Sequence, residues 1–211
     1  ARYMRMVMNQ MNKVQYNDSE SQSENLKILF KSITNITSTF PGFIDDKDGK
    51  AMNNPLGEIE SVIFELNKSG SFAQTLSSFS NSFYSLRNLW SRDMWRVFES
   101  IQKVWSDYKE LKNYTIAIHT KFFDRILTRL IAFMALIDES VLVKQGLLLY
   151  FIGLQMEQAM MTISKFRSLV IVQYEEDLEY DILESLLSSH ESLNIYRYSY
   201  RSYLSLENVL S

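Results

Sequence analysis

The stretch that decides the fold is SFAQTLSSFSNSFYSLRNLWSRDMWRVFESIQKVW, residues 71–105. Its large apolar residues recur every three or four positions, namely Phe72, Leu76, Phe79, Phe83, Leu86, Trp90, Met94, Phe98, Ile101 and Trp105. Residues at this spacing lie on one face of an α-helix. We therefore expect a helix over 71–90 and a second over 92–112, both packed into a core through this face. Ser91 is either the N-cap of the second helix or a kink between the two.

The rest of the chain is also predicted to be helical. There are six glycines and two prolines, and after Gly70 only Gly146 and Gly153 remain. So few breakers, together with apolar residues at helical spacing, indicate long helices. The expected helical segments are 1–16, 21–39, 56–68, 71–90, 92–112, 114–137, 140–172, 174–189 and 191–210. Asn113 is the expected cap of the helix that follows it, and Gly70 is expected in a left-handed conformation.

These segments predict an all-α protein, a single-domain multi-helix bundle of long, mostly antiparallel helices. The domain is expected to cover 1–211. Both terminal segments are still in helical register, so we expect it to be truncated at both ends. Residues 40–55, which hold both prolines, are the one expected loop, an exposed connection.

Composition excludes several classes of protein. The formal net charge is −3, so there is no basic field to hold nucleic acid. The best candidate for a membrane span, 141–156, is interrupted by Lys144 and falls short of the about 20 apolar residues that a span needs. We expect a buried core helix there. The chain has no cysteine, which fits a reducing compartment and a cytoplasmic location.

No assembled catalytic or cofactor motif is present. Phosphate-binding loops need clustered glycines, which the chain lacks. A di-iron site needs Glu-x-x-His on two helices, but neither His119 nor His190 follows an acid by three residues. We therefore expect no metal and no cofactor, and we expect His119 to be a packed or surface residue. Whether the protein is an enzyme stays open, with a non-catalytic role favoured.

Three stretches resemble the bacterial alpha-E domain family. The first is LRNLWSRDMWRVFESI (86–101), through Arg87, Ser91, Asp93, Met94 and Trp95. The second is LIDESVLVKQGLLLYFIGLQMEQA (136–159), through Asp138, Glu139, Ser140, Gly146, Gly153, Glu157 and Ala159. The third is LLSSHESLNIYRYSYRSYLSLENVL (186–210), through Ser192, Tyr196, Arg197 and Tyr200.

The charged motif of that family, Gly-Arg-x-x-Glu-Arg-Ala, is only half retained. The first copy, ARYMRMV (1–7), keeps Arg2 but has Arg5 and Met6 where Glu and Arg are expected. The second copy, GLQMEQA (153–159), keeps Glu157 but has Gln158 in an Arg position.

The resemblance implies an all-helical protein that serves a peptide-modifying system. Members of the family are found fused to, or encoded near, ATP-grasp ligases and transglutaminase-like proteases, so the resemblance implies such partners. Their presence as partners here, together with a peptide, is an expectation from the resemblance and from nothing else in the chain.

Six polar residues are the candidate binding residues or buried ion-pair cluster: Arg2, Arg87, Asp93, Glu157, Tyr196 and Arg197. Either they converge on a peptide or carboxylate ligand, which an arginine holds bidentately, or they pair with one another as buried ions. We expect a non-catalytic accessory or peptide-binding protein. One alternative is an enzyme of unknown reaction that uses a buried Glu/Arg cluster. The other is a purely structural bundle that forms a homo-oligomer.

Overall fold

The structure, a computed structural model, describes residues 1–16, 20–44, 48–139, 144–200 and 204–210. Within these ranges it contains eleven α-helices and one 3₁₀ turn, and no strand. The helices are α1 (Arg2–Tyr16), α2 (Glu20–Thr37), α3 (Lys50–Asn53), α4 (Pro55–Phe64), α5 (Phe72–Ser85), α6 (Arg92–Lys109), α7 (Ile116–Glu139), α8 (Lys144–Leu169), α9 (Glu176–Ser189), α10 (Leu193–Tyr200) and α11 (Leu206–Leu210). The 3₁₀ turn η1 is Arg87–Leu89. The prediction of an all-α fold is confirmed.

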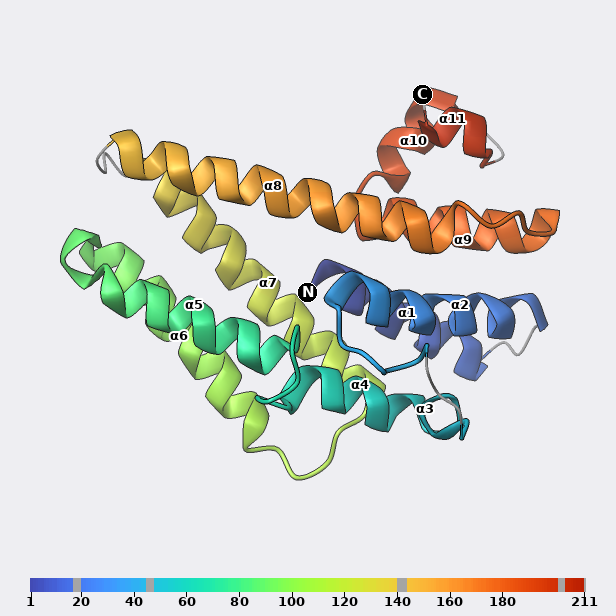
Figure 1. Cartoon of the computed structure of the whole chain (residues 1–211), viewed down its shortest axis with the longest axis horizontal. Coiled ribbons are helices and arrows are strands. Elements are labelled where there is room, and N and C mark those ends of the chain that lie inside the picture. The colour runs from blue at the N-terminus through green and yellow to red at the C-terminus, as the bar shows by residue number, and fades with distance from the viewer. Residues whose placement is uncertain (17–19, 45–47, 140–143, 201–203, 211) are drawn as a thin grey trace.

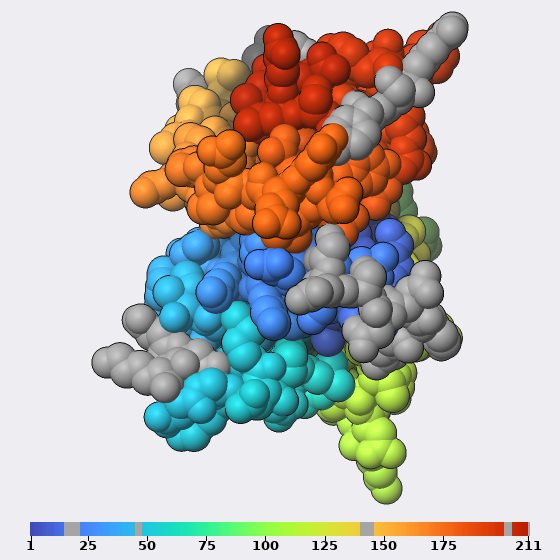
Figure 2. Space-filling model, turned by 90° about the vertical axis from the view of Figure 1, so that its right-hand side faces the viewer, coloured from blue at the N-terminus to red at the C-terminus, as the bar shows by residue number. Residues whose placement is uncertain are grey.

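The helices form stacked layers (Figures 1 and 2). Helices α8 and α9 run almost end to end across one side, α1 and α2 lie beneath them, and α3 and α4 lie beneath those. Helix α7 runs diagonally past α1 and packs against α6, which lies beside α5. Helix α1 contacts α2, α7 and α9, so it lies at the centre of the arrangement.

Residues 71–105 fold as two helices, and the first of them ends earlier than expected. Helix α5 stops at Ser85, and the chain turns through η1 before α6 begins. The reason is Trp90, whose ring stacks on Phe83 with centroids 5.0 Å apart while its indole Nε1 donates to the Phe83 carbonyl at 2.7 Å. Ser91 is the N-cap of α6, because its hydroxyl accepts from the Met94 amide.

The predicted apolar face of this stretch is the aromatic part of the core. Every residue of this apolar face that lies on α6 is buried, and so are Leu76 and Phe83 on α5. Phe83 stacks on Phe98 with centroids 3.8 Å apart. Leu86 is the exception at 47% exposed, since it lies beyond the end of α5. One buried cluster joins these side chains to α1, α2, α4, α7, α8 and α9.

The connection 40–55 is less exposed than expected. Phe43 is buried and stacks on Phe30 with centroids 5.1 Å apart, and its amide donates to the Thr34 hydroxyl at 2.9 Å. Residues 50–53 form the short helix α3. The prediction of a purely exposed loop is therefore wrong, because one aromatic side chain anchors the segment in the core.

Other predicted boundaries shift for local reasons. The expected helix 56–68 ends at Phe64, and the segment 191–210 contains two helices, α10 and α11. Thr115, not Asn113, caps α7, since its hydroxyl accepts from the Ile118 amide at 3.3 Å. For the expected helix 140–172, residues 140–143 lie outside the described part, and the described helix covers 144–169.

The expectation that 141–156 is a buried core helix is wrong for its described part. On α8, Leu148, Leu149 and Ile152 are more than half exposed. The apolar residues of α8 surround the helix and are not confined to one side, so the sequence did not indicate which side faces the core. None of the helices in the described ranges is long and apolar enough to cross a membrane.

His119 is a packed core residue, as expected. It is fully buried, its ring stacks on Tyr114, and its Nδ1 is hydrogen-bonded to the Tyr108 hydroxyl. Its Nε2 lies 3.8 Å from a Glu60 carboxylate oxygen and has no hydrogen-bond partner among the described residues. Burial lowers the pKa of His119 to about 4, because the charged imidazolium loses its hydration.

Gly70 provides a test of backbone geometry. Its φ is +78°, and a Cβ added there would lie 1.7 Å from the Thr37 carbonyl oxygen. We expect Gly70→Ala to lower the free energy of unfolding by more than about 2 kcal/mol, through left-handed strain and a backbone clash. Gly146→Ala is the matched control, because nothing lies within 4 Å of its added Cβ and α8 continues through it. Urea unfolding of both variants checks this, and equal stability of the two would contradict it.

His119 provides a pH test. The unfolded chain protonates its histidine near pH 6.5, whereas the folded chain does so only near pH 4. The unfolded state therefore binds more protons between these values, so stability falls as pH decreases from 6.5 to 4, by on the order of 3 kcal/mol. His119→Phe should flatten this part of the curve in urea unfolding at stepped pH. His190→Gln is the control, because His190 is only half-buried. Its pKa is also lowered, by burial and by the charges of Lys165 and Arg2, while a backbone hydrogen bond to Leu186 opposes this shift. A slope that survives in His119→Phe contradicts the assignment.

Candidate binding cleft

The six candidate residues are not brought together in the structure. Arg87 lies exposed on η1, and Glu157 lies exposed on α8. Asp93 is exposed and pairs with Arg96 on its own helix at 3.3 Å. The expected cluster is not formed among these residues, because their helices direct them to separate parts of the surface. A binding role for any single one of them stays a prediction.

The other three lie on the side of the molecule where α1 meets α9 and α10. Tyr196 is buried in a small cluster with Leu183 and Leu204, and its hydroxyl accepts from the Ser205 amide at 3.3 Å. Arg197 pairs with Glu184 at 2.8 Å. Arg2 is exposed at the start of α1 and lines a cleft.

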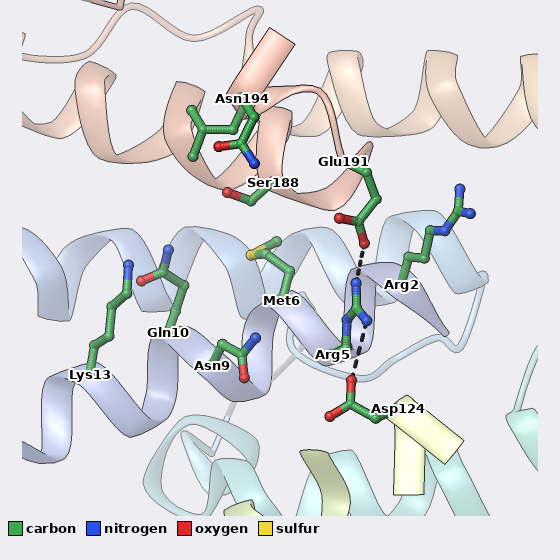
Figure 3. Close-up of a pocket in the computed structure, with 11 residues that line it drawn as sticks. Arg2, Arg5, Met6, Asn9, Gln10, Lys13, Asp124, Ser188, Glu191 and Asn194 are labelled. Atoms are coloured by element: carbon green, nitrogen blue, oxygen red, sulfur yellow. Dashed lines mark hydrogen bonds and ion pairs between the residues drawn. The ribbon is translucent and has the colours of Figure 1, made fainter. Parts of the chain in front are cut away.

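This cleft, of about 360 Å³, lies between α1, the corner joining α9 to α10, and Asp124 of α7 (Figure 3). The residues that line it are predominantly polar: Arg2, Arg5, Met6, Asn9, Gln10, Lys13, Asp124, Ser188, Glu191, Leu193 and Asn194. The α1 residues among them recur at helical spacing, on the side opposite the buried Met4, Val7 and Met8. Burial of the apolar side of α1 therefore fixes which residues face the cleft.

Arg5 is held between two carboxylates at the end of the cleft. Its guanidinium donates to Asp124 at 3.2 Å and to the Glu191 carboxylate (Figure 3). These contacts connect α1 to α7 and to the α9–α10 corner. Both sides of the planar Arg5 guanidinium are occupied by carboxylates, so Arg5 shapes the cleft.

Glu191 has an unusual backbone conformation for its residue type. Its φ is +60°, and the Glu191 and Ser192 amides donate to the carbonyls of Ser188 and Leu187. This is the Schellman arrangement that ends helices, and its left-handed position is usually glycine. A glutamate there adds backbone strain while placing its carboxylate on Arg5.

Lys165 and His190 lie near Arg2, outside the set of residues that line the cleft. Lys165 Nζ lies 3.3 Å from Nε2 of His190 and 5.8 Å from the centroid of the Tyr3 ring. The His190 Nδ1 lies 3.1 Å from the Leu186 carbonyl and donates to it, so Nε2 accepts from Lys165. Burial, and then the charge of Arg2, lower the pKa of Lys165. Among the described residues no carboxylate pairs with Arg2 or Lys165, so this group is suited to an anion.

Two carboxamides complete the lining. Asn9 projects from α1 and Asn194 from the start of α10, on opposite walls of the cleft (Figure 3). Both are exposed, and neither has a hydrogen-bond partner within the described ranges. Gln10, in contrast, donates to the Ser185 hydroxyl at 3.2 Å. Each free carboxamide presents a donor and an acceptor.

Arg2 is the one cleft residue that the sequence singled out. The others come from four helices and have no shared motif, so their proximity is a property of the tertiary structure. The helical phase of Arg2, Arg5, Asn9 and Lys13 was available in the sequence as a polar side of the first segment. The described residues contain no group of three or more side chains arranged to hold a metal ion.

The fold and the cleft thus define an all-helical protein with an open, polar, partly basic groove. All of residues 1–211 match the model of the Alpha-E family, described as a predicted alpha-helical domain with a conserved ER motif. The chain belongs to the Alpha-E family. No curated protein and no solved structure matches it.

Glu191 provides a test of strain at the cleft. Glu191→Gly and Glu191→Ala both lose the pair with Arg5, but only glycine relieves the left-handed backbone. We expect the glycine variant to be more stable than the alanine variant by about 1 kcal/mol in urea unfolding. Ser38, with φ +57° after α2, is the control, and Ser38→Gly and Ser38→Ala should differ in the same direction. An alanine variant at 191 as stable as the glycine variant would contradict the strain.

Proposed function

We propose that this protein is a non-catalytic, peptide-binding accessory protein and that the cleft between α1 and the α9–α10 corner is its binding site. The observation that carries the proposal is the pair of unpartnered carboxamides, Asn9 and Asn194, on opposite walls of the cleft. Arg2 lies at one end of the cleft, beyond the Arg5–Glu191 pair (Figure 3). A carboxamide matches a peptide unit, because each has one N–H side and one C=O side.

The basic side chains near Arg2 indicate which part of a peptide would bind there. Arg2 has no carboxylate partner among the described residues, and its charge disfavours the nearby charge on Lys165. A carboxylate bound here would pair with Arg2 bidentately and reduce that repulsion. The ligand class that fits best is a peptide with a free C-terminal carboxylate or an acidic side chain.

The setting in a peptide-modifying system follows from the family resemblance and is proposed on that basis. An ATP-grasp ligase or a transglutaminase-like protease is the partner class that the proposal expects. A cytoplasmic location is part of the same proposal, and the absence of cysteine supports it. The enzyme alternative is not adopted, because Glu157 and Arg87 lie away from the cleft.

The test is fluorescence anisotropy with fluorescein-labelled hexapeptides that end in a free carboxylate, compared with the same peptides amidated. We expect saturable binding of the free-carboxylate forms, and a rise in Kd of about tenfold for Arg2→Gln, the loss of one charge-assisted contact. Asn9→Ala should raise Kd by about fivefold.

The matched control is Arg87→Gln, which removes the same charge from an exposed arginine on η1 and should leave Kd unchanged. Two results would overturn the proposal. One is equal binding of free and amidated peptides by the wild type. The other is equal loss of affinity in Arg2→Gln and Arg87→Gln, which would indicate a general charge effect.

A further inference from the structure

Helix α8 carries an exposed apolar face that the cleft does not use. Five side chains form it, and we refer to them as the α8 stripe: Leu149, Ile152, Met156, Met160 and Ile163. Each is between 56% and 72% exposed, and Leu148 extends the stripe at 62%. Their spacing places them on one side of the helix.

This surface is large for a monomer. The six side chains present on the order of 600 Å² of apolar surface, the upper end of the range for the largest patch on a monomeric protein. A standard interface buries about 800 Å² on each partner, so these six side chains alone would supply most of the area that one partner of a stable dimer buries.

The spacing of the α8 stripe residues along the chain is symmetric. Its successive intervals are three, four, four and three residues, the same from either end, with Met156 in the middle. Two antiparallel copies of α8 would therefore place Leu149 against Ile163 of the second copy and Ile152 against its Met160. Met156 would face its own counterpart at the twofold axis. Such self-complementarity is what an isologous interface requires.

Charge and space favour the same occupant. From Gly146 to Ser164 the only charged residue is Glu157, so two copies of this surface do not repel each other strongly. A membrane-bound amphipathic helix instead carries Lys and Arg on its polar face, and this segment has none. Gly153 has no atom within 4 Å of its added Cβ, which leaves room for a second helix to approach closely.

We propose that α8 is the interface of a homodimer in which two copies pack antiparallel through the α8 stripe. The proposal is independent of peptide binding, since the stripe and the cleft share no residue. One chain thus has two surfaces, a polar one for a ligand and an apolar one for a second copy.

The first test is the molar mass in solution, by light scattering after size exclusion, at about 100 µM protein, a concentration well above a micromolar Kd. We expect twice the monomer mass for the wild type and the monomer mass for Met156→Glu. Ile152→Gln is a second variant with a milder change, and circular dichroism melts confirm that both fold. A monomeric wild type, or a dimer that persists in Met156→Glu, would overturn the proposal.

The second test is disulfide cross-linking, for which the absence of native cysteine is an advantage. Met156→Cys should form an intermolecular disulfide readily, because the two positions meet at the axis. Leu149→Cys, the control, faces Ile163 of the second copy and should cross-link far less, while Leu149→Cys with Ile163→Cys should recover the bond. Stronger cross-linking at 149 than at 156 would reject the antiparallel arrangement.

Flotation with uncharged phosphatidylcholine vesicles should show no binding. Monomers bound to vesicles through this stripe would assign it to lipid and overturn the proposal.

Discussion

The burial of α1 is the constraint on which the rest of the structure depends. Val7 and Met8 are fully buried, and the helix contacts α2, α7 and α9. Each large apolar side chain buried in this way stabilises the fold by about 1.5–3 kcal/mol. Because the apolar side of α1 packs into the core, its polar side faces the cleft, toward the α9–α10 corner and Asp124 of α7. The cleft is thus a consequence of core packing.

Most charged side chains in and around the cleft pair with one another, and Arg2 does not. Arg5 is committed to Asp124 and Glu191, and Glu184 connects Lys13 of α1 at 3.8 Å with Arg197 of α10. These partly exposed pairs add little stability individually, but together they connect α1, α7, α9 and α10 around one opening. Among the described residues of the cleft, Arg2, Asn9 and Asn194 have no side-chain partner. In the proposed function these three are the groups that bind the ligand.

Within the family resemblance, Arg5 stands where a glutamate is expected. In this chain the carboxylate at that end of α1 comes instead from Glu191 and Asp124, which pair with Arg5. Arg5 of α1 thus contacts two carboxylates from other parts of the chain. Glu191 makes its contact with Arg5 from a left-handed backbone position, which is strained for a residue with a Cβ.

The sequence by itself determined the all-α class, most helix positions and the aromatic core of residues 71–105, because a helical period and a lack of breakers are local properties. It also singled out Arg2 as a candidate residue, and Arg2 lines the cleft. The tertiary structure alone decided that α5 ends at Ser85, since the Phe83 carbonyl is taken by Trp90, seven residues further along. It likewise decided that Arg5, Asp124 and Glu191 meet, because they are more than sixty residues apart in the chain. Helix α8 has apolar residues on every side, so its sequence did not predict which face is buried. Packing against α2 and α9 decided which face stays exposed.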